Sequence, residues 1–249
     1  MRVAIAQVNI TRDREKNLKN CLNTIEEAIE ANSDLVVLPE VSNTGFYPEN
    51  YKLVKDDLRE ELKDFLELSE SSDILIVIGI AERSEGKLYS SAVILQRGEI
   101  IGKHRKTRLF PLTDEKKYFT VGDRVDVFDT KIGRIGVMIC YEIRFPEIAR
   151  KLAMNGAELI AIPSAFPKAR IYHWKILSIA RAIENQLFVV GANCVGIGGG
   201  KSILVDPMGN VLAEGKEKQE LLIRDVDLGE VERVRREFPF LKDLRADIL

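Results

Sequence analysis

The sequence predicts a single α/β domain that contains a mixed sheet or two stacked sheets. Short apolar runs typical of buried strands alternate with segments whose apolar residues recur at helical spacing, and two hairpin patterns interrupt this alternation. Hydrophobic residues make up 45% of the 249 residues, which is ample for one large core. No proline-rich linker, low-complexity block or fixed-period repeat divides the chain, so we expect residues 1–249 to form one domain.

The first half of the chain predicts three strands and two helices. Each expected strand is a short run of apolar, often β-branched residues, and each expected helix has apolar residues three and four positions apart. In chain order the expected elements are a strand over Arg2–Gln7, a helix around residues 18–29, a strand over Leu35–Leu38, a helix over Leu58–Glu70 and a strand over Ile74–Ile80.

From residue 87 the pattern changes. Two hairpin patterns enclose strand–helix units, and one more strand and a charged tail follow the second hairpin. The segment 104–123 is expected to be irregular because charged and aromatic residues follow no period there. The expected elements are a hairpin of Leu88–Gln96 and Ile100–Lys103, strands over Arg134–Ile139, Leu159–Pro163 and Leu187–Asn193, helices over Glu147–Asn155 and Tyr172–Glu184, a second hairpin of Ser202–Val205 and Val211–Ala213, a strand over Leu221–Val226 and a charged helical tail.

Charge and hydropathy exclude several classes of protein. The 37 Lys and Arg residues nearly balance the 39 Asp and Glu residues, so the composition is not that of a strongly basic nucleic-acid binder. No apolar run approaches the roughly 18 residues of a membrane-spanning helix. The first apolar run, Val3–Ala6, is too short for a secretory signal. We therefore expect a cytoplasmic protein with no membrane or nucleic-acid partner.

Cysteine and histidine are scarce. The three cysteines, Cys21, Cys140 and Cys194, lie far apart, which predicts neither a disulfide framework nor a thiolate zinc site. The two histidines, His104 and His173, are too few for a histidine-rich metal site. We expect no metal and no cofactor, and acid–base chemistry by carboxylates or lysine.

The segment Val195–Ser202 contains four glycines before Lys201-Ser202 and invites comparison with a phosphate-binding loop. The first glycine of that motif is replaced by Val195, and an apolar strand pattern rather than a helix follows Ser202. Without a helix N-terminus no cluster of backbone amides is available for phosphate. A glycine-rich loop between two strands is therefore the favoured interpretation over a nucleotide site.

Cys140 lies where a buried strand ends and polar and aromatic residues begin. Such a cysteine is often only a small buried hydrophobic residue. However, the carboxyl end of a strand before a helix is where α/β proteins hold their ligands. The backbone amides that follow, beginning with Tyr141, are also suited to stabilise an oxyanion.

Glu40 and Lys106, like Cys140, allow either a purely structural or a functional interpretation. Glu40 follows a buried strand, and a buried carboxylate is costly unless it is paired or used, although it can also face water at the sheet edge. Lys106 lies in the basic segment 103–108, which taken alone is typical of a solvated loop. Neither residue is decisive by itself.

Taken in order, these motifs resemble the nitrilase superfamily of carbon–nitrogen hydrolases. The resemblance is carried by Leu38-Pro-Glu40, by Arg105-Lys106-Thr107 and by Cys140-Tyr-Glu-Ile-Arg-Phe-Pro146, and it extends over nearly the whole chain. It implies that Glu40 is the general base, Lys106 the cationic stabiliser and Cys140 the nucleophile.

Two further points come from the resemblance, and the residue chemistry supports the assignment independently. Glu115 resembles a second glutamate that many members place beside the other three residues. The family commonly has Tyr two residues before the lysine and His two residues after it, whereas this chain has His104 and Arg108. The residue chemistry agrees with the assignment, because a glutamate can accept the thiol proton and an ammonium can stabilise the thiolate and the oxyanion.

The motifs are most similar to the ω-amidase-like branch, which hydrolyses amides of dicarboxylates such as 2-oxoglutaramate. Arg144 resembles the arginine that holds the distal carboxylate there, although a structural ion pair with Glu142 or Glu147 is an alternative. Tyr47, just past Glu40, is a candidate for the same pocket.

The resemblance implies a four-layer α-β-β-α sandwich, dimerised through a helical face. It implies a cofactor-free cysteine amidase that converts a small carboxylate-bearing amide to acid and ammonia through a thioester. The alternatives are a nitrilase or an N-carbamoyl hydrolase of the same superfamily and, in another class, a non-catalytic binding or scaffold protein that retains the fold.

Overall fold

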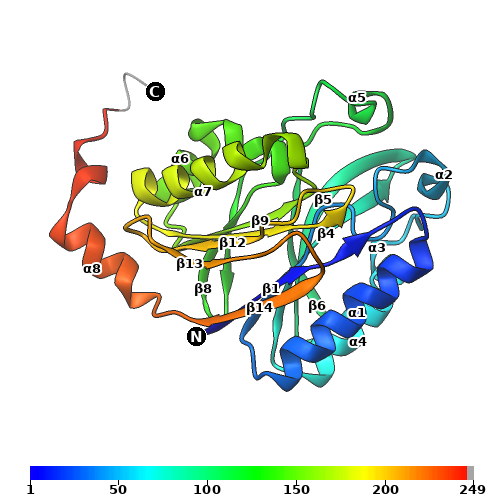
Figure 1. Cartoon of the computed structure of the whole chain (residues 1–249), viewed down its shortest axis with the longest axis horizontal. Coiled ribbons are helices and arrows are strands. Elements are labelled where there is room, and N and C mark those ends of the chain that lie inside the picture. The colour runs from blue at the N-terminus through cyan, green and yellow to red at the C-terminus, as the bar shows by residue number, and fades with distance from the viewer. Residues whose placement is uncertain (246–249) are drawn as a thin grey trace.

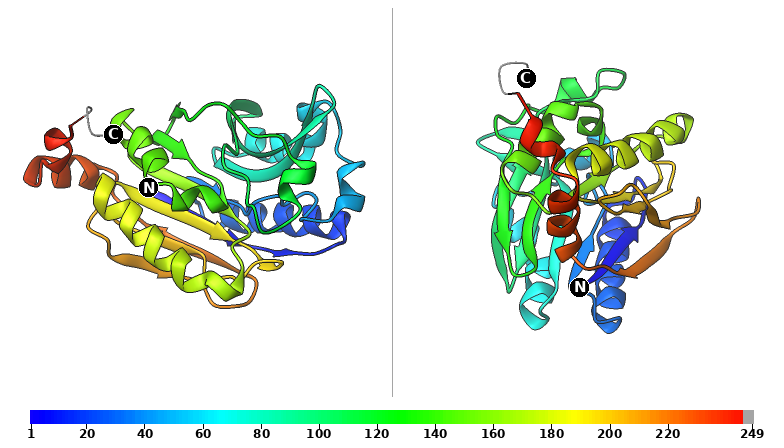
Figure 2. Two further views of the ribbon diagram at one scale, coloured as in Figure 1. Left: turned by 90° about the horizontal axis from the view of Figure 1, so that it is seen from above. Right: turned by 90° about the vertical axis from the view of Figure 1, so that its left-hand side faces the viewer.

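The computed structural model describes residues 1–245, which form two six-stranded sheets stacked face to face with helices on both outer faces (Figure 1). This is a four-layer α-β-β-α sandwich, as the resemblance implied. Figure 2 shows the layers from two further directions. Within the described residues, no helix is long and apolar enough to cross a membrane.

The first sheet is built mainly from the N-terminal half, and its strand order is β14-β1-β3-β4-β5-β6. β1 and β3, and β3 and β4, are parallel, whereas β4, β5 and β6 form an antiparallel meander. The strands are β1 (Arg2–Gln7), β3 (Leu35–Val37), β4 (Leu75–Ser84), β5 (Lys87–Gln96), β6 (Glu99–Arg105) and β14 (Glu220–Asp225). The helices of this half are α1 (Arg14–Glu30), α2 (Pro48–Tyr51), α3 (Leu58–Glu61) and α4 (Lys63–Ser71).

The second sheet has the order β13-β12-β10-β9-β8-β7. Its three central strands, β8, β9 and β10, run parallel, and α6 and α7 connect them across the outer face. The strands are β7 (Val127–Thr130), β8 (Gly133–Val137), β9 (Leu159–Ser164), β10 (Phe188–Asn193), β12 (Ile203–Val205) and β13 (Val211–Glu214). The other elements are β2 (Asn9–Ile10), β11 (Val195–Gly196), α5 (Glu115–Tyr118), α6 (Pro146–Met154), α7 (Ile171–Asn185), α8 (Gly229–Glu237) and three 3₁₀ turns, η1 (Cys140–Arg144), η2 (Lys168–Arg170) and η3 (Phe240–Asp243).

Alternation along β1 shows how the layers are held together. Val3 and Ile5 belong to the core that includes the strands of the second sheet, whereas Ala4 and Ala6 pack with Ile25 and other residues of α1. One face of β1 is thus covered by the second sheet and the other by α1, as expected for a strand whose sequence is a continuous apolar run.

The observed elements differ from the expected ones at a few places. The helix expected over Leu58–Glu70 is two helices, α3 and α4, with Leu62 between them in a non-helical conformation. The segment 104–123 contains the one-turn helix α5, and β7 was not expected. After the glycine-rich Val195–Ser202 segment comes strand β12, in agreement with the loop interpretation.

Candidate active site

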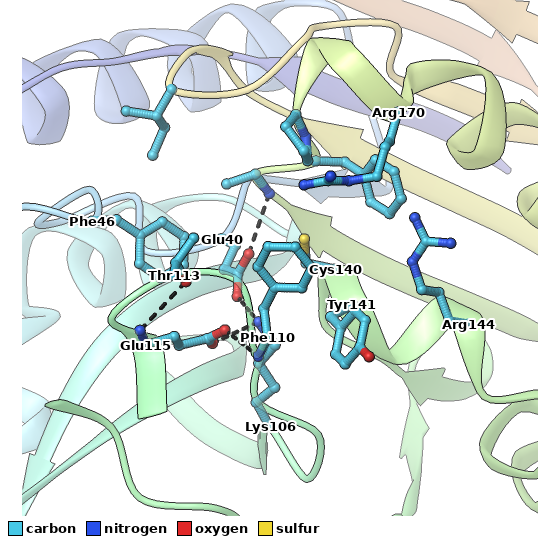
Figure 3. Close-up of a pocket in the computed structure, with 14 residues that line it drawn as sticks. Glu40, Phe46, Lys106, Phe110, Thr113, Glu115, Cys140, Tyr141, Arg144 and Arg170 are labelled. Atoms are coloured by element: carbon cyan, nitrogen blue, oxygen red, sulfur yellow. Dashed lines mark hydrogen bonds and ion pairs between the residues drawn. The ribbon is translucent and has the colours of Figure 1, made fainter. Parts of the chain in front are cut away.

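The ends of three strands deliver the three expected catalytic residues to one place between the sheets. Glu40 follows β3 and Lys106 follows β6 in the first sheet, whereas Cys140 follows β8 in the second sheet. All three residues line one cavity of about 220 Å³ (Figure 3). The face-to-face stacking of the sheets therefore creates the site.

Glu40, Lys106 and Glu115 form a buried hydrogen-bonded chain. The Lys106 Nζ atom donates to Glu40 Oε1 and to Glu115 Oε1, each at 2.7 Å. The side chains of all three residues are almost completely buried. Glu115 also accepts a hydrogen bond from the Phe110 amide at 2.6 Å, which fixes the loop between Lys106 and α5. The structure thus places Glu115 beside the other site residues.

The charges in this chain depend on one another. Burial by itself lowers the pKa of the Lys106 ammonium, but the two adjacent carboxylates outweigh burial and raise it, so the lysine is charged. Burial raises the pKa of Glu115, and the negative charge of Glu40 raises it further, against the opposing effect of Lys106. The single Lys106 ammonium therefore compensates the charge of two neighbouring carboxyl groups.

Glu40 has two further hydrogen-bond donors. Ser90 Oγ on β5 donates to Glu40 Oε1 at 3.2 Å, and the Ala165 amide after β9 donates to Oε2 at 3.3 Å. These donors come from both sheets, so the direction of the carboxylate is fixed by the same packing that forms the cavity.

Cys140 begins the 3₁₀ turn η1 in a left-handed backbone conformation, with φ of 43°. Burial raises the pKa of its thiol well above the ordinary value, the negative charges of Glu40 and Glu115 add to this, and Lys106 and the Ala165 amide only partly oppose it. The resting residue is therefore a neutral thiol, although the sequence suggested that the lysine would favour the thiolate. Reaction requires a base, and Glu40 lies beside it in the cavity.

Two glycines allow the backbone to pass close to the site residues. A Cβ atom on Gly79 in β4 would lie 2.5 Å from the Pro39 carbonyl oxygen and 2.6 Å from the Glu40 Cα. A Cβ atom on Gly122 would lie 2.1 Å from the Arg105 carbonyl oxygen, next to Lys106. Both glycines thus allow the backbone to approach closely behind Glu40 and Lys106.

Arg144 and Arg170 bring two guanidinium groups to one side of the cavity (Figure 3). Arg144 lies over the Phe166 ring and donates to His173 Nδ1, and Arg170 lies over the Phe110 ring. Among the described residues, neither arginine has a carboxylate within ion-pair distance. The alternative ion pair of Arg144 with Glu142 or Glu147 is not formed.

The structure separates Tyr47 from the cavity. Its ring lies against the Arg12 guanidinium, and the neighbouring Phe46 lines the cavity instead. Tyr47 is the residue before α2, where the backbone turns into the helix and directs successive side chains to different sides. Tyr141 does line the cavity, with its ring packed edge-on against Phe110. The oxyanion role of the Tyr141 amide stays a prediction.

Arg170 and Glu142 were not found by sequence reasoning. Arg170 lies in the 3₁₀ turn η2 between β9 and α7, where no apolar pattern marks it. Glu142 was considered only as a partner of Arg144, but it is fully buried and accepts hydrogen bonds from His104 and Thr107. His173 and Trp174 begin α7, where Trp174 is buried and donates to the Lys201 carbonyl oxygen.

Nearly the whole chain is similar to a known protein family and to named relatives. The family model described as carbon-nitrogen hydrolase matches residues 2–236. The chain is 36% identical to the 2-oxoglutaramate amidase of Bacillus subtilis over 241 residues, which cover 94% of this chain and 93% of that protein. It is 31% identical to the omega-amidase NIT2 of Mus musculus, over 99% of this chain and 96% of that protein.

The fold comparison agrees. Saccharomyces cerevisiae Nit3, described as a member of branch 10 of the nitrilase superfamily, superposes with a TM-score of 0.89 at 30% identity. The match covers 98% of this chain and 96% of the yeast chain.

Proposed function

Since the chain belongs to the carbon–nitrogen hydrolase family and is an amidase, we propose that it hydrolyses a small amide with a carboxylate remote from the scissile bond. The observation that carries this proposal is the pair of arginines, Arg144 and Arg170, which line the cavity of Cys140 and have no carboxylate partner within residues 1–245. A guanidinium presents a planar fork of donors that matches a carboxylate. The names of the relatives, 2-oxoglutaramate amidase and omega-amidase, support the same substrate class.

The proposed first half-reaction begins at the neutral thiol. Glu40 accepts the proton of Cys140 as the sulfur attacks the amide carbonyl carbon, which breaks the carbonyl π bond and forms a tetrahedral oxyanion. The Lys106 ammonium stabilises the negative charge, together with the amide of Tyr141. Glu40 returns the proton to the amide nitrogen, the C–N bond breaks and ammonia leaves, so that a thioester remains on Cys140.

The second half-reaction reuses the same groups. Glu40 takes a proton from water, the water oxygen attacks the thioester carbonyl, and collapse of the oxyanion returns the electron pair to sulfur. The thiolate regains its proton from Glu40 and the acid product leaves. Glu115 supports these steps by holding Lys106 and sharing its charge.

The experiment that tests the substrate class compares two amides in wild type and in Arg144→Ala. With 2-oxoglutaramate, loss of a charge-assisted contact of about 1.5–3 kcal/mol should reduce kcat/KM by roughly 10- to 10²-fold. Propionamide offers no carboxylate to the arginine, so its hydrolysis should change little. Equal losses on both amides would mean that Arg144 only supports the fold, and the proposed substrate class would be wrong.

Two variants sharpen this comparison. Arg144→Lys keeps the charge but loses the bidentate geometry, so it should still weaken hydrolysis of 2-oxoglutaramate. Arg170→Ala tests whether the second guanidinium contributes to the same selectivity. Ammonia release from carbamoyl compounds and from nitriles distinguishes the other members of the superfamily. A carbamoyl substrate releases carbon dioxide together with ammonia, and a nitrilase converts nitriles to acids.

A further inference from the structure

Glu142 is a fully buried carboxylate that does not line the cavity. It lies two residues after Cys140 in η1. Removing an ionised carboxylate from water is costly unless hydrogen bonds and an opposite charge compensate for it. Its surroundings therefore need an explanation that the proposed catalytic steps do not give.

Four donors converge on this carboxylate. Glu142 Oε2 accepts from the Ile139 amide at 2.7 Å and lies 2.8 Å from His104 Nε2. Glu142 Oε1 accepts from the amide of Thr107 at 2.7 Å and from its hydroxyl at 2.6 Å. Both oxygens are thus satisfied by donors from two separate segments of the chain.

These donors flank the two catalytic residues of opposite sheets. Ile139 immediately precedes Cys140, whereas Thr107 immediately follows Lys106 and His104 precedes it by two residues. Cys140 itself has the left-handed φ of 43°, a conformation that is uncommon for residues other than glycine. One carboxylate thus joins the backbone of the nucleophile to the segment that carries the lysine.

We propose that Glu142 is a positioning residue for the amidase reaction, whose carboxylate holds Cys140 and Lys106 in fixed relation while His104 holds the carboxylate. This inference rests on the proposed function, because it assumes that Cys140 and Lys106 react together. Glu142 is not among the residues that line the cavity.

His104 is suited to this task because it is buried between charged neighbours. Burial by itself lowers the pKa of His104, but the Glu142 carboxylate outweighs burial and raises it, with help from the Arg124 carbonyl and Asp126. On the same strand, Lys103 and Arg105 point to the opposite face. The His104 ring and the Glu142 carboxylate form a buried pair that links the two sheets.

Glu142→Gln tests the proposal because a glutamine amide cannot replace an acceptor-only carboxylate here. Either orientation of the amide directs its NH₂ group at donors, from Thr107 or from Ile139 and His104. We expect kcat for 2-oxoglutaramate to fall by about 10²-fold, as for a displaced catalytic group, with KM changed by less than about threefold. A separate readout is the alkylation rate of Cys140 by iodoacetamide, which should fall at least about tenfold for the same reason.

Glu82→Gln is the matched control. Glu82 in β4 is equally buried and also accepts four hydrogen bonds, one each from Ser91 and Lys103 and two from Arg105. It contacts side chains on the opposite face of β6 and adjoins neither catalytic side chain. This variant should lose thermal stability while kcat and the alkylation rate stay close to those of wild type. If Glu142→Gln and Glu82→Gln behave alike in both assays, Glu142 only stabilises the fold and the inference is wrong.

Thr107→Val keeps the test decisive if Glu142→Gln does not fold. It removes one donor hydroxyl and should reduce kcat and the alkylation rate together by a few-fold, whereas unchanged values would contradict the inference. The alkylation readout also separates the two proposals. If the wild type hydrolyses no carboxylate-bearing amide but the alkylation pattern holds, the positioning role stands and the proposed substrate class fails.

Discussion

At the scale of single residues, the candidate site depends on charge compensation among buried side chains. Glu40, Lys106 and Glu115 are each nearly inaccessible to solvent, and the Lys106 ammonium contacts both carboxylates at 2.7 Å. The Cys140 thiol is neutral at rest because burial and the two carboxylates raise its pKa. Activation of the nucleophile therefore requires proton transfer rather than a preformed thiolate.

Glu40→Gln tests the proton transfer. The substitution keeps the shape of the side chain but removes the base, so acylation should slow by about 10²–10⁴-fold, the usual contribution of a positioned proton acceptor. Single-turnover ammonia release measures the step, and circular dichroism checks that the fold is kept. Acylation at the wild-type rate would assign the base to another residue.

Lys106→Ala tests the charge compensation. The variant leaves Glu40 and Glu115 buried without a cation, which should cost about 3–5 kcal/mol of unfolding free energy and abolish most activity. The control is Lys63→Ala, because Lys63 is exposed and pairs only with Glu67 on the surface of α4. Chemical denaturation compares the unfolding free energies of the two variants. An equally small loss in both would mean that Lys106 belongs to a solvated basic loop.

At the scale of elements, the strand ends and the close approaches behind them position the site. Most strands and helices could be predicted from apolar periodicity, including β1 with the observed bounds Arg2–Gln7. The motif residues Glu40, Lys106 and Cys140 were predicted as well, through the resemblance of the ordered motifs to the nitrilase superfamily. Glu40 and Cys140 also follow apolar runs that end abruptly, whereas Lys106 lies in a basic segment.

Other parts of the site could not be predicted because long-range packing determines them. The ring of Phe46 rather than Tyr47 faces the cavity because of the turn into α2, and the sequence pattern does not encode that direction. Glu142 meets its partners His104 and Thr107 only when the two sheets stack. Arg170 belongs to a 3₁₀ turn without apolar periodicity.

Gly79→Ala tests the close approach between β4 and the Glu40 segment. The added methyl group would overlap the Pro39 carbonyl and the Glu40 backbone, so the segment must shift. We expect a loss of about 1–3 kcal/mol in stability, the usual cost of overpacking. Displacement of the base should also reduce kcat by about 10²-fold. The control is Gly86→Ala in the β4–β5 turn, where no atom lies within 4 Å of the added carbon but φ is +72°. That variant should lose stability without loss of kcat, and similar kcat values in both variants would contradict the account.

At the scale of the whole molecule, one core joins the two sheets, so the single domain expected for residues 1–249 predicts one cooperative unfolding transition. The homodimer that the resemblance implies also stays a prediction. The α7 helix presents exposed apolar side chains on its outer face, namely Tyr172, Ile176 and Ile183.

The pair of His104 and Glu142 should make the stability of the molecule depend on pH. The raised pKa of His104 contributes stability that is complete below its ordinary value of 6.5 and is lost as pH rises through the folded-state pKa. Burial by itself raises the pKa of Glu142, but the charge of His104 and the hydrogen bonds from His104 and Thr107 outweigh burial and lower it. This lowered pKa contributes stability above 4.5 that is lost as pH falls. The stability difference between wild type and His104→Gln should therefore be largest between these values and should shrink at alkaline pH. Thermal unfolding across pH measures it, and a difference independent of pH would mean that His104 is uncharged.

The central claim is that Cys140 is the nucleophile of an amidase. The direct measurement is ammonia release from 2-oxoglutaramate by wild type, by Cys140→Ala and by Cys21→Ala, which removes a buried thiol in α1 instead. We predict steady ammonia release by wild type and by Cys21→Ala, and none above background by Cys140→Ala with the fold intact. Near-normal turnover by Cys140→Ala would contradict the account.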